Sequence, residues 1–228
     1  MRIRVALLAA VGMVLALVAT VAFVITRAGA DAESCSSFRD SARDRAGVVT
    51  GAGEEILVIG DSYSVGLGVK LRESWPTRLP GQVRVDGFSG SGFSRGASPC
   101  GNVSYAARAP HSVRPDTTMV VVEGGLNDAD QPRAAIVAGF EALVRQLEGR
   151  PVLVVGPPMA PARADRVPAV DSLLADLAAA HGASYLSMVD LDLTYLPDGL
   201  HLTADGHRAF GEAVAARVDE LVAGLTPA

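Results

Sequence analysis

The stretch ILVIGDS, residues 56–62, carries the strongest fold signal in this chain of 228 residues. Four apolar residues, three of them β-branched, run without interruption into Gly60 and then into the polar pair Asp61 and Ser62. An apolar run that does not alternate with polar residues is typical of a strand buried on both faces of a parallel sheet. The stretch therefore predicts a central strand that ends in a turn, with the hydroxyl of Ser62 exposed just beyond it.

Strand-like runs of the same kind recur along the chain. Residues 119–122 (MVVV) and 152–155 (VLVV) are continuous apolar runs of four. The run at 83–85 (VRV) is shorter and weaker, so it is expected nearer an edge of the sheet. Residues 184–186 form a fifth candidate strand.

Helical patterns separate these runs. Apolar residues spaced by about 3.6 positions cover residues 136–147, 167–177 and 210–221. Gly182 suits the position after the second of these helices, and Thr203 suits the cap before the last one. Strands that alternate with helices predict right-handed βαβ units. The expected fold is therefore a three-layer α/β/α sandwich around a central, mostly parallel, five-stranded sheet.

The composition is that of a folded globular protein, with 49% hydrophobic and 20% charged residues. The net charge is −5, and because the first 30 residues hold three arginines and no acid, the rest of the chain carries −8. An acidic body without a basic run argues against nucleic-acid binding, which depends on neutralising phosphates. Two cysteines are too few for a disulfide-rich scaffold or for a zinc site built from four thiolates.

The N-terminal segment 1–30 is predicted to bring the protein to a membrane. Residues 5–26 carry no charge, and as a helix they would span about 33 Å, enough for a hydrocarbon core of about 30 Å. Two arginines precede the run and one follows it, which favours an N-in orientation. The length favours an uncleaved anchor, whereas the sequence Ala-Gly-Ala at 28–30 suits signal cleavage, so a secreted form stays open. Both alternatives put residues 31–228 outside the cytoplasm.

Residues 31–53 are polar and are expected to be a linker with at most one helical turn, followed by a folded domain over residues 54–225. Outside the cytoplasm, Cys35 and Cys100 are expected to form a disulfide, with two unpaired thiols as the alternative. Such a bond would close a loop of about 65 residues and would stabilise the domain by roughly 4 kcal/mol at best.

Four distinctive segments follow predicted strands. They are GDS at 60–62, GFSG at 87–90, EGGLND at 123–128 and DGLH at 198–201. In an open parallel sheet, functional groups gather at the carboxyl ends of the strands. All four segments are therefore expected at one edge of the sheet, which makes that edge the predicted site.

Ser62, His201 and Asp198 are the candidate catalytic residues at this edge. A serine hydroxyl is a weak nucleophile unless a base removes its proton, and His201 can be that base. Asp198 lies three residues before His201, so a turn can direct its carboxylate to one ring nitrogen and leave the other for Ser62. An ester attacked by Ser62 develops an oxyanion, which needs hydrogen-bond donors about 3 Å away. The candidate donors are the backbone amides of Ser62 and Gly90 and the side-chain amide of Asn127.

Together the four segments resemble the sequence blocks of the SGNH, or GDSL, hydrolases. The resemblance covers roughly residues 55–222, and the third block matches the pattern Gly-x-Asn-Asp as residues 125–128. It implies a flavodoxin-like α/β/α fold and serine esterase or lipase chemistry without a metal or another cofactor. By it, Ser62 is the nucleophile, His201 the base and Asp198 its partner, and the oxyanion hole consists of Ser62, Gly90 and Asn127.

One residue departs from the pattern of that family. Tyr63 stands where a smaller aliphatic residue is common after the serine, and it is expected to narrow the site. His207, a competing base, falls within the last helical pattern and is expected to be a surface or packing residue.

Two other functions remain open from the sequence. Acyl transfer to a hydroxyl other than water would use the same residues, and a non-catalytic binding module could keep the same fold. A metal hydrolase is disfavoured because no His-x-x-x-His pattern or carboxylate cluster occurs, and nucleotide binding because no G-x-x-x-x-G-K-[ST] loop occurs. The expected partner is a small-molecule, lipid or sugar ester.

Overall fold

The computed structural model describes residues 13, 20 and 31–225 of the chain. The predicted membrane segment, residues 5–26, lies almost entirely outside the described residues. In the part that is described, no helix combines the length and the apolar character needed to cross a bilayer. The anchor or signal at the N-terminus therefore stays a prediction.

The chain divides into two compact units, Met1–Ser37 and Phe38–Ala228. Residues 31–46 are helical, so the expectation of a polar linker with at most one helical turn is wrong for this stretch. In the second unit, Phe38 packs edge-to-face on Phe88, with ring centroids 6.4 Å apart. A helix in a protein is stabilised mainly by tertiary packing, which a polar composition does not reveal.

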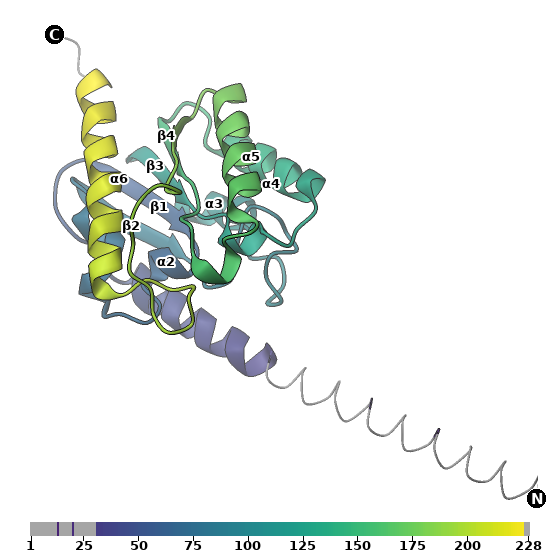
Figure 1. Ribbon diagram of the computed structural model, residues 1–228. Helices are drawn as coiled ribbons and strands as arrows, with labels where there is room; N and C mark the ends of the chain where they lie inside the picture. Colours follow the sequence, from purple (N-terminus) through teal and green to yellow (C-terminus); the bar gives the residue numbers. More distant parts are fainter. Residues whose placement is uncertain (1–12, 14–19, 21–30, 226–228) are drawn as a thin grey trace, which may run out of the picture. The chain divides into compact units, whose positions relative to one another are not determined.

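Five parallel strands form one sheet in the order β2-β1-β3-β4-β5 (Figure 1). All five predicted strands are present, and the weak candidate around residues 83–85 is the edge strand β2. Gly60 lies opposite Gly87, and Ile59 lies opposite Val122, so the first three strands end side by side. The strand bounds are β1 Glu55–Gly60, β2 Gln82–Gly87, β3 Thr117–Glu123, β4 Val152–Val155 and β5 Ser184–Leu186.

Helices cover both faces of the sheet (Figure 1). The α-helices are α2 Ser62–Val65, α3 Tyr105–Ser112, α4 Arg133–Gln146, α5 Val167–Ala180 and α6 Ala204–Leu225. The described residues also contain four 3₁₀ turns, namely η1 Leu71–Glu73, η2 Trp75–Arg78, η3 Leu126–Asp128 and η4 Pro161–Arg163. Helix α6 packs on one face, and α3, α4 and α5 pack on the other. Helix α3 had no counterpart among the predicted helices, since its segment is short, is polar on average and contains Pro110.

The strands are apolar on both sides because each side meets a helix layer. Along β1, Val58 faces the layer that contains Phe210 of α6, whereas Leu57 faces the layer that contains Phe140 of α4. Burying a side chain of this size stabilises a fold by about 1.5–3 kcal/mol. The three-layer α/β/α sandwich predicted from the sequence is thus the fold observed.

Candidate active site

Ser62 begins helix α2 directly after strand β1. Asp61 caps this helix, and its Oδ1 accepts a hydrogen bond from the backbone amide of Tyr63 at 2.9 Å. Gly60 leaves no room for a side chain, because a Cβ there would lie 2.1 Å from Ser64 Oγ. The tight turn puts Ser62 at the carboxyl edge of the sheet, where the residue is only 7% exposed. It is therefore less open to solvent than the sequence predicted.

The structure brings Ser62, His201 and Asp198 together. Nε2 of His201 lies 3.1 Å from Oγ of Ser62, and Nδ1 lies 2.7 Å from Oδ2 of Asp198. The other carboxylate oxygen of Asp198 accepts hydrogen bonds from the backbone amides of Leu200 and His201. These contacts, above all the one with the imidazole, lower the pKa of Asp198 to about 2. The carboxylate therefore stays ionised and holds the ring with Nε2 toward the serine.

The three predicted oxyanion donors lie on turns that Asn127 connects. Its Nδ2 donates to Oδ2 of Asp61 at 3.0 Å and to the carbonyl of Ser91 at 2.9 Å. Asn127 thereby ties the Ser62 turn to the turn after β2, in which Gly90 has a φ of +77° that favours glycine. Among the described residues, the backbone amides of Ser62 and Gly90 have no acceptor. Both amides are thus free to donate to a bound oxygen, whereas Asn127 must share one of its hydrogens to do so.

Two buried carboxyl groups lie beneath the Ser62 turn. Oε2 of Glu123 accepts a hydrogen bond from Oγ of Ser64 at 2.6 Å. Burial raises the pKa of Asp61 to about 6. Burial, together with the nearby charge of Asp61, raises the pKa of Glu123 well above its usual value. Glu123 is therefore expected to be protonated where surface glutamates are ionised.

A third buried carboxyl, that of Asp128, holds the loop after Gly90. Its two oxygens accept hydrogen bonds from the backbone amides of Phe93 and Ser94, at 2.9 and 2.8 Å. Gly92 fits against this carboxyl only because it has no side chain, since a Cβ would lie 2.4 Å from Oδ2. Asp128 therefore fixes the loop that carries Gly90, which sequence reasoning had not assigned to it.

His207 and Tyr63 lie behind the site. His207 is buried, and burial lowers its pKa to about 4. Its Nδ1 faces the backbone amide of Trp75 at 3.4 Å, so it packs in the core, in agreement with its expected role. Tyr63 is also buried, at 1% exposure, and the expectation that it narrows the site stays a prediction.

Sequence reasoning missed Asp61, Glu123 and Asp128 as parts of the site. The signal for Glu123 was a single acid at the end of a strand that is otherwise apolar on both faces. A charged residue at such a position is buried, and a buried carboxyl needs donors close by. Asp61 and Asp128 were quoted in their motifs, but a motif does not show that their partners are backbone amides.

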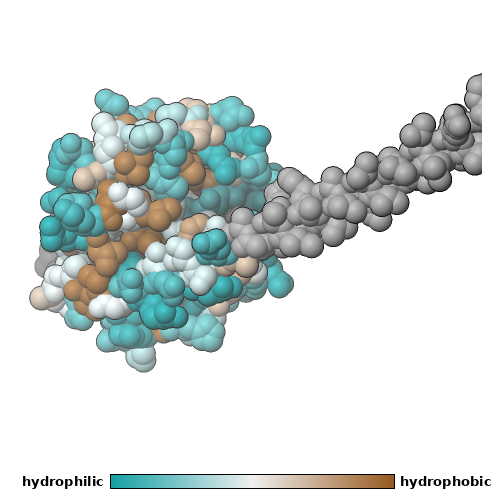
Figure 2. All heavy atoms as spheres, turned by 90° about the horizontal axis from the view of Figure 1, so that it is seen from below, coloured by the Kyte–Doolittle hydropathy of each residue, from teal (hydrophilic) through white to brown (hydrophobic). Residues whose placement is uncertain are grey.

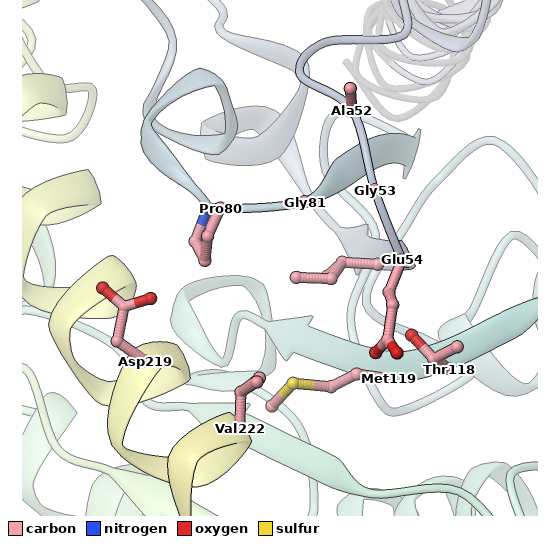
Figure 3. A pocket seen from close by; sticks show the side chains of 10 residues that line it. Ala52, Gly53, Glu54, Pro80, Gly81, Thr118, Met119, Asp219 and Val222 are labelled. Carbon is pink, nitrogen blue, oxygen red and sulfur yellow. The ribbon is translucent and has the colours of Figure 1, made fainter. Parts of the chain in front are cut away.

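A hollow of about 360 Å³ lies at the opposite edge of the sheet (Figure 3). Its walls come from the segments before β1 and β2, from the start of β3 and from the second half of α6. The two carboxylates shown there, Glu54 and Asp219, lie on different walls and are both exposed. No residue that lines it pairs a hydroxyl with an imidazole, so the hollow is separate from the Ser62 site. Within residues 31–225, no group of three or more His, Cys, Asp or Glu side chains could hold a metal ion.

The face at the carboxyl edge has an apolar surface. Figure 2 views the protein from below Figure 1, where helix α6 begins, and a hydrophobic band crosses this face. Partly exposed apolar residues in the segments after β1, β4 and β5 are Leu67, Val69, Met159, Leu196 and Leu200. A ligand that approaches Ser62 therefore meets apolar side chains as well as the polar turn.

Residues 58–209 match the GDSL-like lipase/acylhydrolase family. Est24, a carbohydrate acetylesterase from Sinorhizobium meliloti, has a similar structure, with a TM-score of 0.65 and 20% identity over 74% of this chain and all of that one. The aryl esterase of M. smegmatis is similar at a TM-score of 0.63 and 21% identity, over 74% of this chain and all of that one. A family two carbohydrate esterase from Clostridium thermocellum has a TM-score of 0.63 and 15% identity, over 77% of this chain and 66% of that one. No curated protein sequence matches the chain at a significant level.

The parallel sheet with its serine turn and the matched family region are those of a carboxylic ester hydrolase. The chain belongs to the GDSL-like lipase/acylhydrolase family, which is the family that its four sequence blocks resemble.

Proposed function

We propose that the protein is an extracytoplasmic serine esterase that hydrolyses carboxylic esters through Ser62, His201 and Asp198. One observation carries the proposal. Residues 139 positions apart in the chain meet so that Nε2 of His201 lies 3.1 Å from the hydroxyl of Ser62. The 2.7 Å contact between Nδ1 and Asp198 gives the ring the orientation that a general base needs.

The reaction follows from these contacts in two steps. Oγ of Ser62 attacks the ester carbonyl carbon while Nε2 of His201 takes the hydroxyl proton. The tetrahedral oxyanion accepts hydrogen bonds from the free amides of Ser62 and Gly90, with Asn127 as the third donor. When the carbon–oxygen bond breaks, the alcohol leaves with the proton from Nε2, and the acyl group stays on Ser62. Water then attacks this ester, again with His201 as base, and the carboxylic acid is released.

The substrate is proposed to be a small ester with an apolar or weakly polar acyl group. The nucleophile is only 7% exposed, which suits a short acyl group, and partly exposed apolar side chains lie around it. Structural neighbours described as a carbohydrate acetylesterase and an aryl esterase support acetyl and aryl esters as the first substrates to try.

The location is proposed from the N-terminal sequence and the redox state of the cysteines. The uncharged run at 5–26 suits an anchor, and a cleaved signal is the alternative. Cys35 and Cys100 are both disulfide-bonded, as predicted, and structural disulfides persist mainly outside the cytoplasm. If the domain is external, protease added to intact expressing cells will degrade it. Protection until the cells are lysed would contradict this location.

The activity is tested with purified full-length protein in a non-ionic detergent. Turnover of 4-nitrophenyl acetate, butyrate and octanoate is compared for wild type and Ser62→Ala, which is expected to lose at least about 10³-fold in kcat. Ser89→Ala is the matched control, because Ser89 is also a buried serine at this edge and its hydroxyl has no partner. A fluorophosphonate probe should add its mass to wild type and to the control but not to Ser62→Ala. Equal turnover or labelling of the Ser62 variant would refute the proposal.

A further inference from the structure

We propose that Tyr63 is a positioning residue, whose hydroxyl fixes the loop that carries His201 to the turn that carries Ser62. The inference rests on the proposed function, since it concerns the alignment of these two residues. Oη of Tyr63 donates a hydrogen bond of 2.5 Å to the carbonyl of Leu200, although the two residues are 137 positions apart. Tyr63 directly follows Ser62, and Leu200 directly precedes His201.

The hydrogen bond therefore closes a small ring around the reacting groups. From the Ser62 side chain, the ring runs through the backbone to Tyr63, across its phenol to Leu200, and through the backbone to His201. The contact of 3.1 Å between Nε2 and Oγ completes it. A length set on one side of such a ring limits the separation on the other side, so the phenol limits how far the imidazole can move from the hydroxyl.

The tyrosine is itself held rigidly. Its ring is 1% exposed and packs against two residues of helix α6, His207 at 6.0 Å and Phe210 at 5.9 Å between ring centroids. At its other end, the Tyr63 backbone amide donates to Oδ1 of Asp61. A phenol fixed at both ends by packing and hydrogen bonds can transmit position, which a mobile surface tyrosine cannot.

The remaining contacts of the His201 loop are mostly internal. The amide of Leu196 donates to the carbonyl of His201 at 2.7 Å, and Oδ1 of Asp198 accepts the amides of Leu200 and His201. The carbonyl of Gly199 accepts from Ala162 in η4, at 2.9 Å. These bonds make the loop a compact unit but do not connect it to the Ser62 turn. Within the described residues, the bond from Tyr63 is the hydrogen bond that makes this connection besides the one between Ser62 and His201 themselves, and the rings of Tyr63 and His201 also lie 6.3 Å apart between centroids.

The test is Tyr63→Phe in the full-length protein in detergent, with 4-nitrophenyl acetate as substrate. The substitution keeps the buried ring and removes only the hydroxyl. We expect kcat per active site to fall roughly tenfold to a hundredfold, because a misplacement of about 1 Å has this effect on an aligned reaction. KM should stay within about twofold of wild type, since the buried ring does not reach the substrate. Active sites are counted from the burst of 4-nitrophenol at acylation, so partly unfolded protein does not enter the result.

Tyr185→Phe is the matched control. Its hydroxyl also makes a partly buried hydrogen bond, to Asp171 at 2.6 Å, but it joins β5 to α5 and not the two loops of the site. This variant is expected to lose thermal stability and to keep kcat per active site. If Tyr63→Phe also loses only stability and keeps kcat per active site within about twofold, the inference is wrong. If Ser62→Ala retains turnover, the proposed function fails instead, whatever the Tyr63 variant does.

Discussion

The buried carboxyl group of Glu123 gives a prediction about stability at different pH values. Burial and the nearby charge of Asp61 raise its pKa well above the usual value for glutamate. In the unfolded chain the same group releases its proton near pH 4.3. Above that pH and below its pKa in the fold, the folded protein therefore binds one proton more than the unfolded chain. Because the group has a raised pKa, its effect is to make the protein less stable as the pH rises through this window.

The magnitude follows from that one proton. A difference of one bound proton changes the free energy of unfolding by about 1.4 kcal/mol per pH unit. Glu123→Gln keeps the shape of the side chain and an oxygen that can accept the hydrogen bond from Ser64, but it has no proton to release. The stability of the variant is therefore expected to fall less steeply with pH than that of wild type, by up to this amount per unit above about pH 4.5. While Glu123 is protonated, Asp61, whose pKa is raised mainly by its own burial, contributes equally to both proteins, because the neutral acid and glutamine both carry no charge.

The assay is urea unfolding of both proteins at closely spaced values between pH 4.5 and 7.5. The quantity compared is the difference in free energy of unfolding between variant and wild type, which should grow in favour of the variant as the pH rises. Glu148→Gln is the control, because Glu148 is an exposed acid near the end of α4, and its curve should run parallel to wild type. Parallel curves for Glu123→Gln and wild type between pH 5 and 6.5 would mean that Glu123 is ionised in the fold. The account of the buried acids given above would then be wrong.

Two further predictions concern the imidazoles. Asp198→Asn is expected to lower kcat by about 10³–10⁴-fold at pH 7. The hydrogen bonds of the wild-type carboxylate lower its pKa to about 2, so it is ionised and can balance a positive charge on His201, whereas asparagine cannot. Steady-state kinetics with 4-nitrophenyl acetate measures the loss, and a loss below tenfold would contradict the prediction. His207→Gln is expected to leave the shape of the kcat/KM profile from pH 5 to 9 unchanged, since burial lowers the pKa of His207 to about 4. Urea unfolding should show a loss of roughly 1 kcal/mol in stability, because the contact with Trp75 is altered. A profile displaced along the pH axis would instead make His207 part of the chemistry.

The parts of the fold that depend on burial on both faces were predictable from the sequence. Helices cover both faces of the sheet, so a central strand such as β3 has side chains buried on both sides. Burial of this kind is visible in the sequence as an uninterrupted apolar run, here residues 119–122. The common edge of Ser62 and His201 was predictable for the same reason, since parallel strands present their carboxyl ends together. The helix at residues 31–46 was not predictable, because it is polar and is held by a few contacts such as that of Phe38 with Phe88.

The supporting hydrogen bonds of the site could not be predicted, because their partners are mostly backbone groups. The bond from Tyr63 ends on the carbonyl of Leu200, and those of Asp128 end on the amides of Phe93 and Ser94. A backbone carbonyl or amide is present at every residue, so the sequence does not show which one a side chain reaches. What the sequence did show was an unusual residue beside Ser62, but it did not show which group Tyr63 would contact.

The buried acids also explain which donors remain for a substrate. A carboxyl group is costly to bury unless donors satisfy it, and here most of the donors are the backbone amides of the turns at the carboxyl edge. Asp61 and Asp128 accept from the amides of Tyr63, Phe93 and Ser94, and Glu123 accepts from the hydroxyl of Ser64. In the same turns, the amides of Ser62 and Gly90 have no acceptor among the described residues. If Ser62 is the nucleophile, as we propose, the amides of Ser62 and Gly90 can donate to the oxyanion that an ester develops when Ser62 attacks it.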